Sequence, residues 1–173
     1  MTLDRFVALD VEVASRTPLR VCSIGVVRID AGREVDAYQS LVHVDGPIRY
    51  GHIHRLTSRD LADAPMWPQV WTHVLRVLGD VDTIVAFRAS FDRSAVLTMA
   101  AHYNLRLPRL RFVCAAKMIE ERYGVRGSLR DAVQTLGRSF PGQPHDPLAD
   151  ARAAALVAQA CMTPLLAISM RDG

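Results

Sequence analysis

The sequence predicts an α/β fold with a five-stranded mixed sheet flanked by helices. Two observations support this. Three strand-like stretches come first, at residues 6–11, 21–29 and 35–44, and the turn sequence Asp30-Ala31-Gly32-Arg33 separates the last two. After them, helical stretches alternate with two short apolar strands, at residues 83–87 and 111–114. An antiparallel meander of strands 1–3 followed by alternating helix and strand is typical of a mixed sheet covered by helices.

The helices are predicted from periodicity and capping residues. Residues 68–78 place their large apolar side chains on one helical face, and further helices are expected at residues 92–103, 115–123 and 129–136. Residues 45–66 are rich in turn formers, so only a short helix from about Ser58 is expected there. The last helix is expected to start at Asp146-Pro147, because Asp is a good N-cap and Pro fits the first helical position.

Length and composition indicate one globular domain, residues 1–173, with a core at about 6–160 and a short tail at 163–173. Residues 153–170 carry no formal charge, but Pro164 and several polar residues favour a buried helix and a tail over a membrane span. The net charge of +3 permits a polyanionic partner without requiring one. Three cysteines without a C-x-x-C pair are interpreted as reduced core thiols of a cytoplasmic protein.

The first candidate site feature is a pair of acids, Asp10 and Glu12, at the end of the first predicted strand. Residues i and i+2 of a strand point to the same side, so both carboxylates leave the sheet together. Their repulsion in a poorly solvated place is relieved by a divalent cation, and oxygen ligands suit Mg²⁺ or Mn²⁺. Taken alone, the pair is explained more simply by two solvated acids where a strand ends.

Three more residues with suitable chemistry lie at similar junctions. Asp92 follows the buried strand at residues 83–87, and ligands gather at the carboxyl ends of strands in open α/β sheets. His145 precedes the last helix, where it can transfer a proton at neutral pH, and Asp150 falls in the first turn of that helix. Each feature has a plainer alternative, a charge near a helix dipole or a surface histidine beside a capped helix. Together, in this order, they indicate one acidic catalytic cluster.

With these residues in place, the sequence resembles the DEDDh family of 3′→5′ exonucleases, which includes the proofreading epsilon subunit of DNA polymerase III and ribonuclease T. The resemblance covers about residues 6–160. The stretches FVALDVEVAS, VAFRASFD and HDPLADA are similar to the three exonuclease motifs of the family. CSIGVVRI, IHRLT and DAP followed by Trp67 match its intervening landmarks in order. The resemblance implies a ribonuclease H-like fold.

The resemblance also implies roles for individual residues. It assigns two divalent cations, Mg²⁺ or Mn²⁺, to the four acids Asp10, Glu12, Asp92 and Asp150, and the role of general base to His145. Three further positions match residues that pack near the terminal nucleotide: Ile53, His54 and Phe91. The implied activity is hydrolysis of the terminal phosphodiester bond at the 3′ end of single-stranded DNA or RNA, which releases nucleoside 5′-monophosphates. A polymerase partner is compatible with this activity.

Some positions depart from the family pattern. The second motif usually reads V-A-H-N, whereas residues 85–88 read V-A-F-R. Neither replaced residue is a metal ligand, but the Asn helps to shape the substrate groove. Arg88 is a candidate phosphate contact in its place, because guanidinium pairs well with phosphate oxygens. Arg55 stands where the family usually has Gly, and Pro147 where it usually has Ala. These changes leave the catalytic set whole and bear on substrate preference and rate.

Two other functions fit the same sequence. A catalytically weak or silent nucleic-acid-binding or polymerase-associated module would share the fold, but it would not need the complete set of acids and histidine. A small-RNA processor such as an oligoribonuclease would share the chemistry, although the landmarks fit the proofreading branch better. Nothing in the sequence separates DNA from RNA or defines the oligomeric state.

Overall fold

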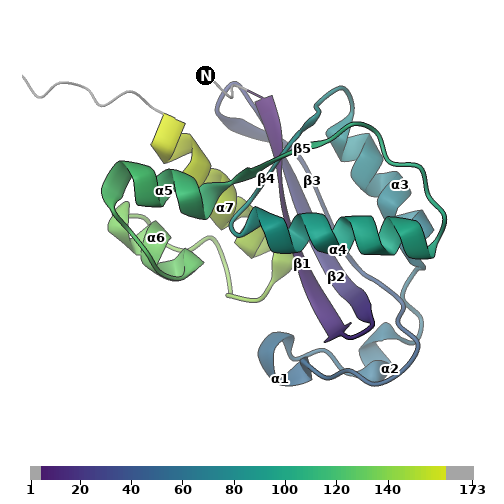
Figure 1. Cartoon of the computed structure of the whole chain (residues 1–173). Coiled ribbons are helices and arrows are strands. Elements are labelled where there is room, and N and C mark those ends of the chain that lie inside the picture. Colours follow the sequence, from purple (N-terminus) through teal and green to yellow (C-terminus); the bar gives the residue numbers. More distant parts are fainter. Residues whose placement is uncertain (1–4, 163–173) are drawn as a thin grey trace, which may run out of the picture.

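The five strands form one open sheet in the order β3-β2-β1-β4-β5 (Figure 1). β1 (Arg5–Arg16), β2 (Leu19–Asp30) and β3 (Arg33–Leu41) form an antiparallel meander. β4 (Thr83–Ala86) pairs in parallel with β1, and β5 (Arg111–Cys114) in parallel with β4. The predicted five-stranded mixed sheet is therefore confirmed. The structure is a computed structural model and describes residues 5–162, so the tail expected at 163–173 lies outside the described residues.

Helices cover both faces of the sheet. They are α1 (Gly51–His54), α2 (Ser58–Leu61), α3 (Trp67–Leu78), α4 (Ala89–His102), α5 (Ala115–Tyr123), α6 (Leu129–Thr135) and α7 (Pro147–Met162). Strand residues such as Val7 and Leu9 pack with α3 and α4 on one face, whereas Phe6 and Ala8 pack with α5, α6 and α7 on the other. This alternation follows from the two-residue period of a strand buried on both faces, and Figure 1 shows the two helical layers on either side of the sheet.

Local sequence rules account for most of the boundaries. Ala31 and Gly32 have φ values of 47° and 76°, and their turn joins β2 to β3 where the turn sequence was predicted. Thr57 and Ser128 form the capping boxes of α2 and α6, and Pro147 is the first residue of α7. The helix α1 was not predicted, because its four residues are too few to show a period.

The core includes two tryptophans: the rings of Trp67 and Trp71 are buried and stacked, with centroids 5.5 Å apart. The three cysteines are free, but only Cys22 is buried, while Cys114 and Cys161 are partly exposed. The prediction of three core thiols therefore holds for Cys22 alone. Within residues 5–162, no helix combines the length and apolarity needed to cross a membrane.

Candidate active site

The acids of β1 lie just beyond the point where β1 stops pairing with β4. β4 pairs only with Val7 and Ala8 of β1, whereas β2 pairs with β1 along its full length. The prediction that the strand ends at Asp10 and Glu12 was wrong, because pairing with β2 carries it on to Arg16. Register shifts follow Glu12, which marks a bulge next to the acids. The two carboxylates therefore stand on a strand that continues past the end of its parallel neighbour.

Asp92 joins these acids through a backbone contact. It lies in the first turn of α4, directly after β4, and its side chain is 3% exposed. The amide of Val11, beyond the paired part of β1 and β4, donates a hydrogen bond to Asp92 Oδ1 at 3.3 Å. Because Val11 lies between Asp10 and Glu12, this bond fixes the carboxylate of Asp92 beside both of them.

The start of α7 is pressed onto the same part of the sheet. Gly25 pairs with Asp10 across β1 and β2, and a Cβ atom at Gly25 would overlap the peptide group that joins Pro147 to Leu148. Only glycine permits this close approach. It brings Asp150, in the first turn of α7, to the acids of β1.

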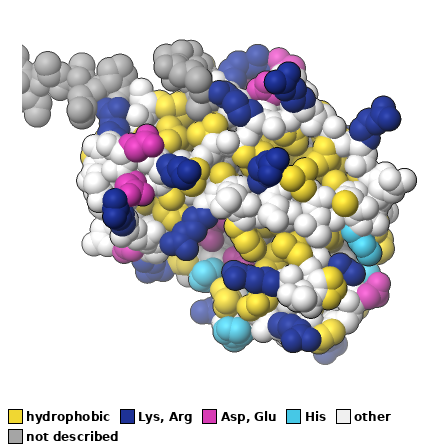
Figure 2. All heavy atoms as spheres, viewed as in Figure 1, with side chains coloured by type: hydrophobic (Ala, Val, Ile, Leu, Met, Phe, Trp, Pro, Cys, Tyr) yellow, Lys and Arg dark blue, Asp and Glu magenta, His cyan; other side chains and the backbone are white. Residues whose placement is uncertain are grey.

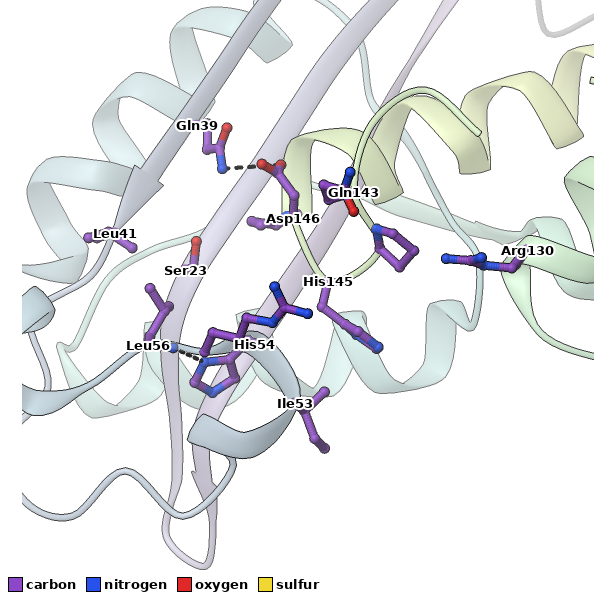
Figure 3. Close-up of a pocket in the computed structure, with 13 residues that line it drawn as sticks. Ser23, Gln39, Leu41, Ile53, His54, Leu56, Arg130, Gln143, His145 and Asp146 are labelled. Carbon is purple, nitrogen blue, oxygen red and sulfur yellow. Dashed lines mark hydrogen bonds between the residues drawn. The ribbon is translucent and has the colours of Figure 1, made fainter. Parts of the chain in front are cut away.

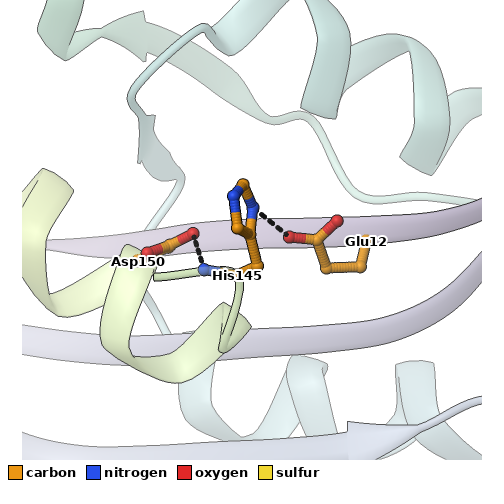
Figure 4. Close-up of side chains that lie close together, drawn as sticks. All are labelled: Glu12, His145 and Asp150. Carbon is orange, nitrogen blue, oxygen red and sulfur yellow. Dashed lines mark hydrogen bonds and ion pairs between the residues drawn. The ribbon is translucent and has the colours of Figure 1, made fainter. Parts of the chain in front are cut away.

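His145 lies between two of the acids (Figure 4). Its backbone amide donates to Asp150 Oδ2 at 3.1 Å, and its Nδ1 atom is 3.5 Å from Glu12 Oε1. The residue has φ of +65°, in the left-handed region that few residues other than glycine occupy. Its side chain is 54% exposed, so the imidazole is accessible to a substrate or to water.

The loop that carries His145 is fixed by Asp146. Asp146 Oδ1 accepts hydrogen bonds from the amides of Leu148 and Ala149, at 3.0 and 3.1 Å, as the predicted N-cap of α7 does. The same oxygen accepts a bond from Gln39 Nε2 of β3 at 3.2 Å. This contact joins residues far apart in the sequence, so the local sequence pattern could not predict it.

Burial weakens all four acids, and repulsion within the cluster weakens Asp10 and Glu12 further. The pKa of Asp10 lies well above its usual value because the group is buried and surrounded by the charges of Asp92, Asp150 and Glu12. Burial, then the charges of Asp150 and Asp92, raise the pKa of Glu12 to about 7. Burial also raises the pKa of Asp92 and of Asp150, although backbone amides that donate to them act in the opposite direction. Such a cluster is costly to ionise without a compensating cation.

The donor set fits a divalent metal ion. Glu12, His145 and Asp150 each offer a ligand atom, and these atoms lie within 4.8 Å of one another. Asp150 Oδ1 is buried and has no hydrogen-bond partner among the residues that the structure describes. A buried carboxylate oxygen without a partner is expensive, and a hard cation with oxygen ligands would satisfy it.

The three residues predicted to pack near the terminal nucleotide differ in how far they are exposed. Ile53, 39% exposed, and Phe91, half-buried, lie on α1 and α4. His54 is 7% exposed; its Nδ1 accepts from the Leu56 amide at 3.2 Å, and its Nε2 is 3.7 Å from Cys22 Sγ. The contacts of His54 therefore fix the position of the segment that follows α1.

Two arginines complete the surroundings. Arg88 precedes α4, is exposed, and donates from Nη2 to the carbonyl of Gly127 at 3.5 Å. The guanidinium carbon of Arg16 lies 5.3 Å from the ring centre of Phe91 and 5.6 Å from that of Tyr50. These rings are far from Arg16 in the sequence, so only the fold reveals the contact. Figure 2 shows basic side chains spread over the visible face rather than gathered in one patch.

The comparison with known proteins agrees with this site. The sequence matches the family described as Exonuclease over residues 7–158, so the chain belongs to that family. This confirms the exonuclease family to which the sequence motifs pointed, and with it the enzyme class, an exonuclease. No functionally curated protein matches the sequence.

Solved structures share the fold at low identity. The nuclease domain of 3′hExo, a DEDDh family member bound to rAMP, superposes with a TM-score of 0.79 at 16% identity, covering 93% of this chain and 95% of that one. Exonuclease X in complex with 5′ overhanging duplex DNA gives 0.66 at 23% identity, covering 88% and 89%. S. pombe Pop2p in its Mg²⁺- and Mn²⁺-bound form gives 0.69 at 15% identity, covering 88% and 81%. The predicted ribonuclease H-like fold is thereby confirmed.

Proposed function

We propose that the protein, acting as a single domain, removes nucleotides one at a time from the 3′ end of single-stranded DNA or RNA and releases nucleoside 5′-monophosphates. The observation that carries this proposal is the convergence of four acids and one exposed histidine from β1, α4 and the start of α7. A binding module would gain nothing from a cluster of four carboxylates, two of them buried and two partly buried, that is costly to ionise in the metal-free fold.

The proposed metal ligands are Asp10, Glu12, Asp92 and Asp150. When bound, two Mg²⁺ or Mn²⁺ ions would supply an activated water and stabilise charge on the leaving 3′ oxygen. The Mg²⁺- and Mn²⁺-bound form of the Pop2p neighbour supports this choice of ions.

His145 is the proposed general base. Its ring is exposed, whereas its backbone is held in place by the hydrogen bond to Asp150. The imidazole can therefore rotate about a fixed backbone position toward a water at the scissile phosphate. In its neutral form the imidazole accepts the proton of the attacking water, and it later loses that proton to solvent. The nearby Glu12 carboxylate stabilises the imidazolium that forms.

The terminal nucleotide of the substrate is proposed to contact apolar side chains, and a phosphate group is proposed to contact an arginine. Ile53, which lines the same cavity as His145, and Phe91, the residue before Asp92, would offer apolar surface to the terminal nucleotide, and His54 supports the segment after Ile53. Arg88 is placed at the start of α4, where its guanidinium can reach a phosphate. Neighbours bound to rAMP and to duplex DNA are consistent with either type of nucleic acid.

One experiment tests the proposal directly. Single-stranded DNA and RNA labelled at the 5′ end are incubated with the protein in Mg²⁺, in Mn²⁺ and in chelator. The expected result is a ladder of products shortened from the 3′ end, present with metal and absent with chelator. Intact substrate under every metal condition, with binding retained, would instead identify a silent binding module.

A further inference from the structure

A cavity of about 480 Å³ lies beside His145 and outside the four acids (Figure 3). Ser23 and Gln39 of the sheet line one side of it, residues 53–56 and Arg130 of α6 line other sides, and residues 143–147 complete the wall. None of Asp10, Glu12, Asp92 and Asp150 lines it. The cavity has the size of sites that hold small ligands, which are typically about 300–1,000 Å³.

Arg55 places its side chain on this cavity at a conformational cost. It is the C-cap of α1, with φ of +63°, and its amide donates to the Gly51 carbonyl at 2.8 Å. Glycine serves this left-handed capping position without strain, so the backbone alone gives no reason for an arginine. Among residues 5–162, four residues other than glycine have positive φ, and two of them, Arg55 and His145, line the same cavity. Backbone strain of this kind clusters at active sites and ligand clamps, which makes the cavity a candidate site.

The charges around the cavity favour an anion. Arg55 and Arg130 are exposed cations that enter the wall from α1 and α6, on separate elements. The one carboxylate of the lining is Asp146, and its Oδ1 already accepts three hydrogen bonds. Gln143 adds an amide donor to the same wall. Guanidinium groups present paired N–H donors that match the oxygens of a phosphate.

We propose that this cavity binds a phosphate group of the nucleic acid strand other than the scissile one. The inference rests on the proposed function, since it assumes that a strand is held at the acids. His145 and Ile53 belong both to the catalytic surroundings and to the cavity wall, so a strand engaged at the acids has its next unit within reach of Arg55. Arg55 and Arg130 bind that phosphate and thereby raise affinity for strands of more than one phosphodiester.

The test compares two substrates in the Arg55→Gly variant. This variant removes the guanidinium and relieves the left-handed strain, so its Tm should equal or exceed that of the unmodified protein. With a 5′-labelled oligothymidylate, KM is expected to rise roughly 3- to 10-fold, as for an exposed charge-assisted contact. The dependence of log KM on log salt should weaken by about 0.7, the value for one phosphate contact on a single strand. With the p-nitrophenyl ester of thymidine 5′-monophosphate, which has a single phosphodiester, kcat/KM should change less than twofold.

Controls separate the possible outcomes. Arg33→Gln removes one exposed arginine at the other end of the sheet and should leave both substrates unaffected, whereas Arg130→Gln should reproduce the oligonucleotide effect. An unchanged oligonucleotide KM and salt slope in Arg55→Gly would overturn the inference while the proposed function stands. A change confined to inhibition by inorganic phosphate would place a free anion in the cavity and would also overturn it. If the unmodified protein cleaves neither substrate, the proposed function itself fails.

Discussion

The backbone amide of His145 donates to Asp150 Oδ2 at 3.1 Å, so the proposed base and a proposed metal ligand are joined by one hydrogen bond. The other oxygen of Asp150 is buried without a partner among the described residues. One carboxylate therefore positions the histidine with one oxygen and presents the second to the cluster. Loss of the carboxylate charge should affect metal binding first and histidine placement second.

Asp150→Asn separates these two roles. The amide oxygen of Asn can still accept from the His145 amide, but the group lacks the charge that a divalent ion requires. We expect metal affinity to collapse and kcat to fall roughly 10³-fold, since a bound metal contributes several kcal/mol of transition-state stabilisation. Calorimetric titration with Mn²⁺ and a 3′-shortening assay measure the two effects. Near-normal turnover would remove Asp150 from the set of ligands. The Asp36→Asn variant is the matched control, because Asp36 is an exposed carboxylate on β3, outside the cluster of acids and the cavity.

The stability of the metal-free protein should fall as the pH rises from about 5 to 8. The pKa of Glu12 in the folded protein is about 7, above its ordinary value of 4.5, and the pKa of Asp10 is also raised. In this window the folded state keeps protons that the unfolded state has lost, so each raised carboxyl stabilises the fold at low pH and loses that contribution as the pH passes its folded pKa. For Glu12 alone the difference is of the order of 3 kcal/mol.

Thermal unfolding in chelator and in Mn²⁺ measures this effect. With chelator, Tm is expected to be higher at pH 5 than at pH 8, and Glu12→Gln should flatten the dependence. With Mn²⁺, the stabilisation should grow as the pH rises, because the ion binds the ionised carboxylates. A metal-free Tm that increases from pH 5 to pH 8 would contradict the raised pKa values of the cluster.

The sequence predicted the sheet well because each strand carries its own evidence. The alternation of buried faces and the turn at Ala31 and Gly32 are local features, and both appear in the structure. The end of β1 was placed too early because its continuation to Arg16 depends on pairing with β2, a contact between distant segments. The extent of a strand is set by its partners as much as by its own residues.

The candidate site divides in the same way. Asp10, Glu12, Asp92, His145 and Asp150 could be named from the sequence because each belongs to a motif at a recognisable junction. The Val11–Asp92 bond, the approach of α7 to Gly25 and the cavity at Arg55 could not, since each joins segments remote in the chain. Motifs identify chemical groups, whereas the contacts that position them follow only from packing.

His145→Gln should slow catalysis while metal binding persists. Glutamine preserves the backbone amide that bonds to Asp150 but cannot accept a proton at neutral pH. We expect kcat to fall by roughly 10²- to 10⁴-fold, the range for loss of general acid–base catalysis. The Mn²⁺ titration should stay within a few-fold of the unmodified protein. The matched control is His102→Gln at the end of α4, which should change neither quantity. A variant that turns over normally would show that another group removes the proton.

Gly25→Ala should damage activity and stability together. The added methyl would overlap the peptide group between Pro147 and Leu148, so the start of α7 must move away from β2 and carry Asp150 and His145 with it. Overpacking of a tight interior costs typically about 1–3 kcal/mol, and backbone atoms cannot rotate aside as a flexible side chain can. Gly124→Ala provides the comparison: its Cβ meets nothing within 4 Å, so it incurs only the strain of a left-handed residue, about 1–2 kcal/mol. Denaturant unfolding should therefore show a loss for both variants, but only Gly25→Ala should lose Mn²⁺ affinity and nuclease activity. Full activity in Gly25→Ala would mean that the close packing of α7 against β2 is not needed to position the acids.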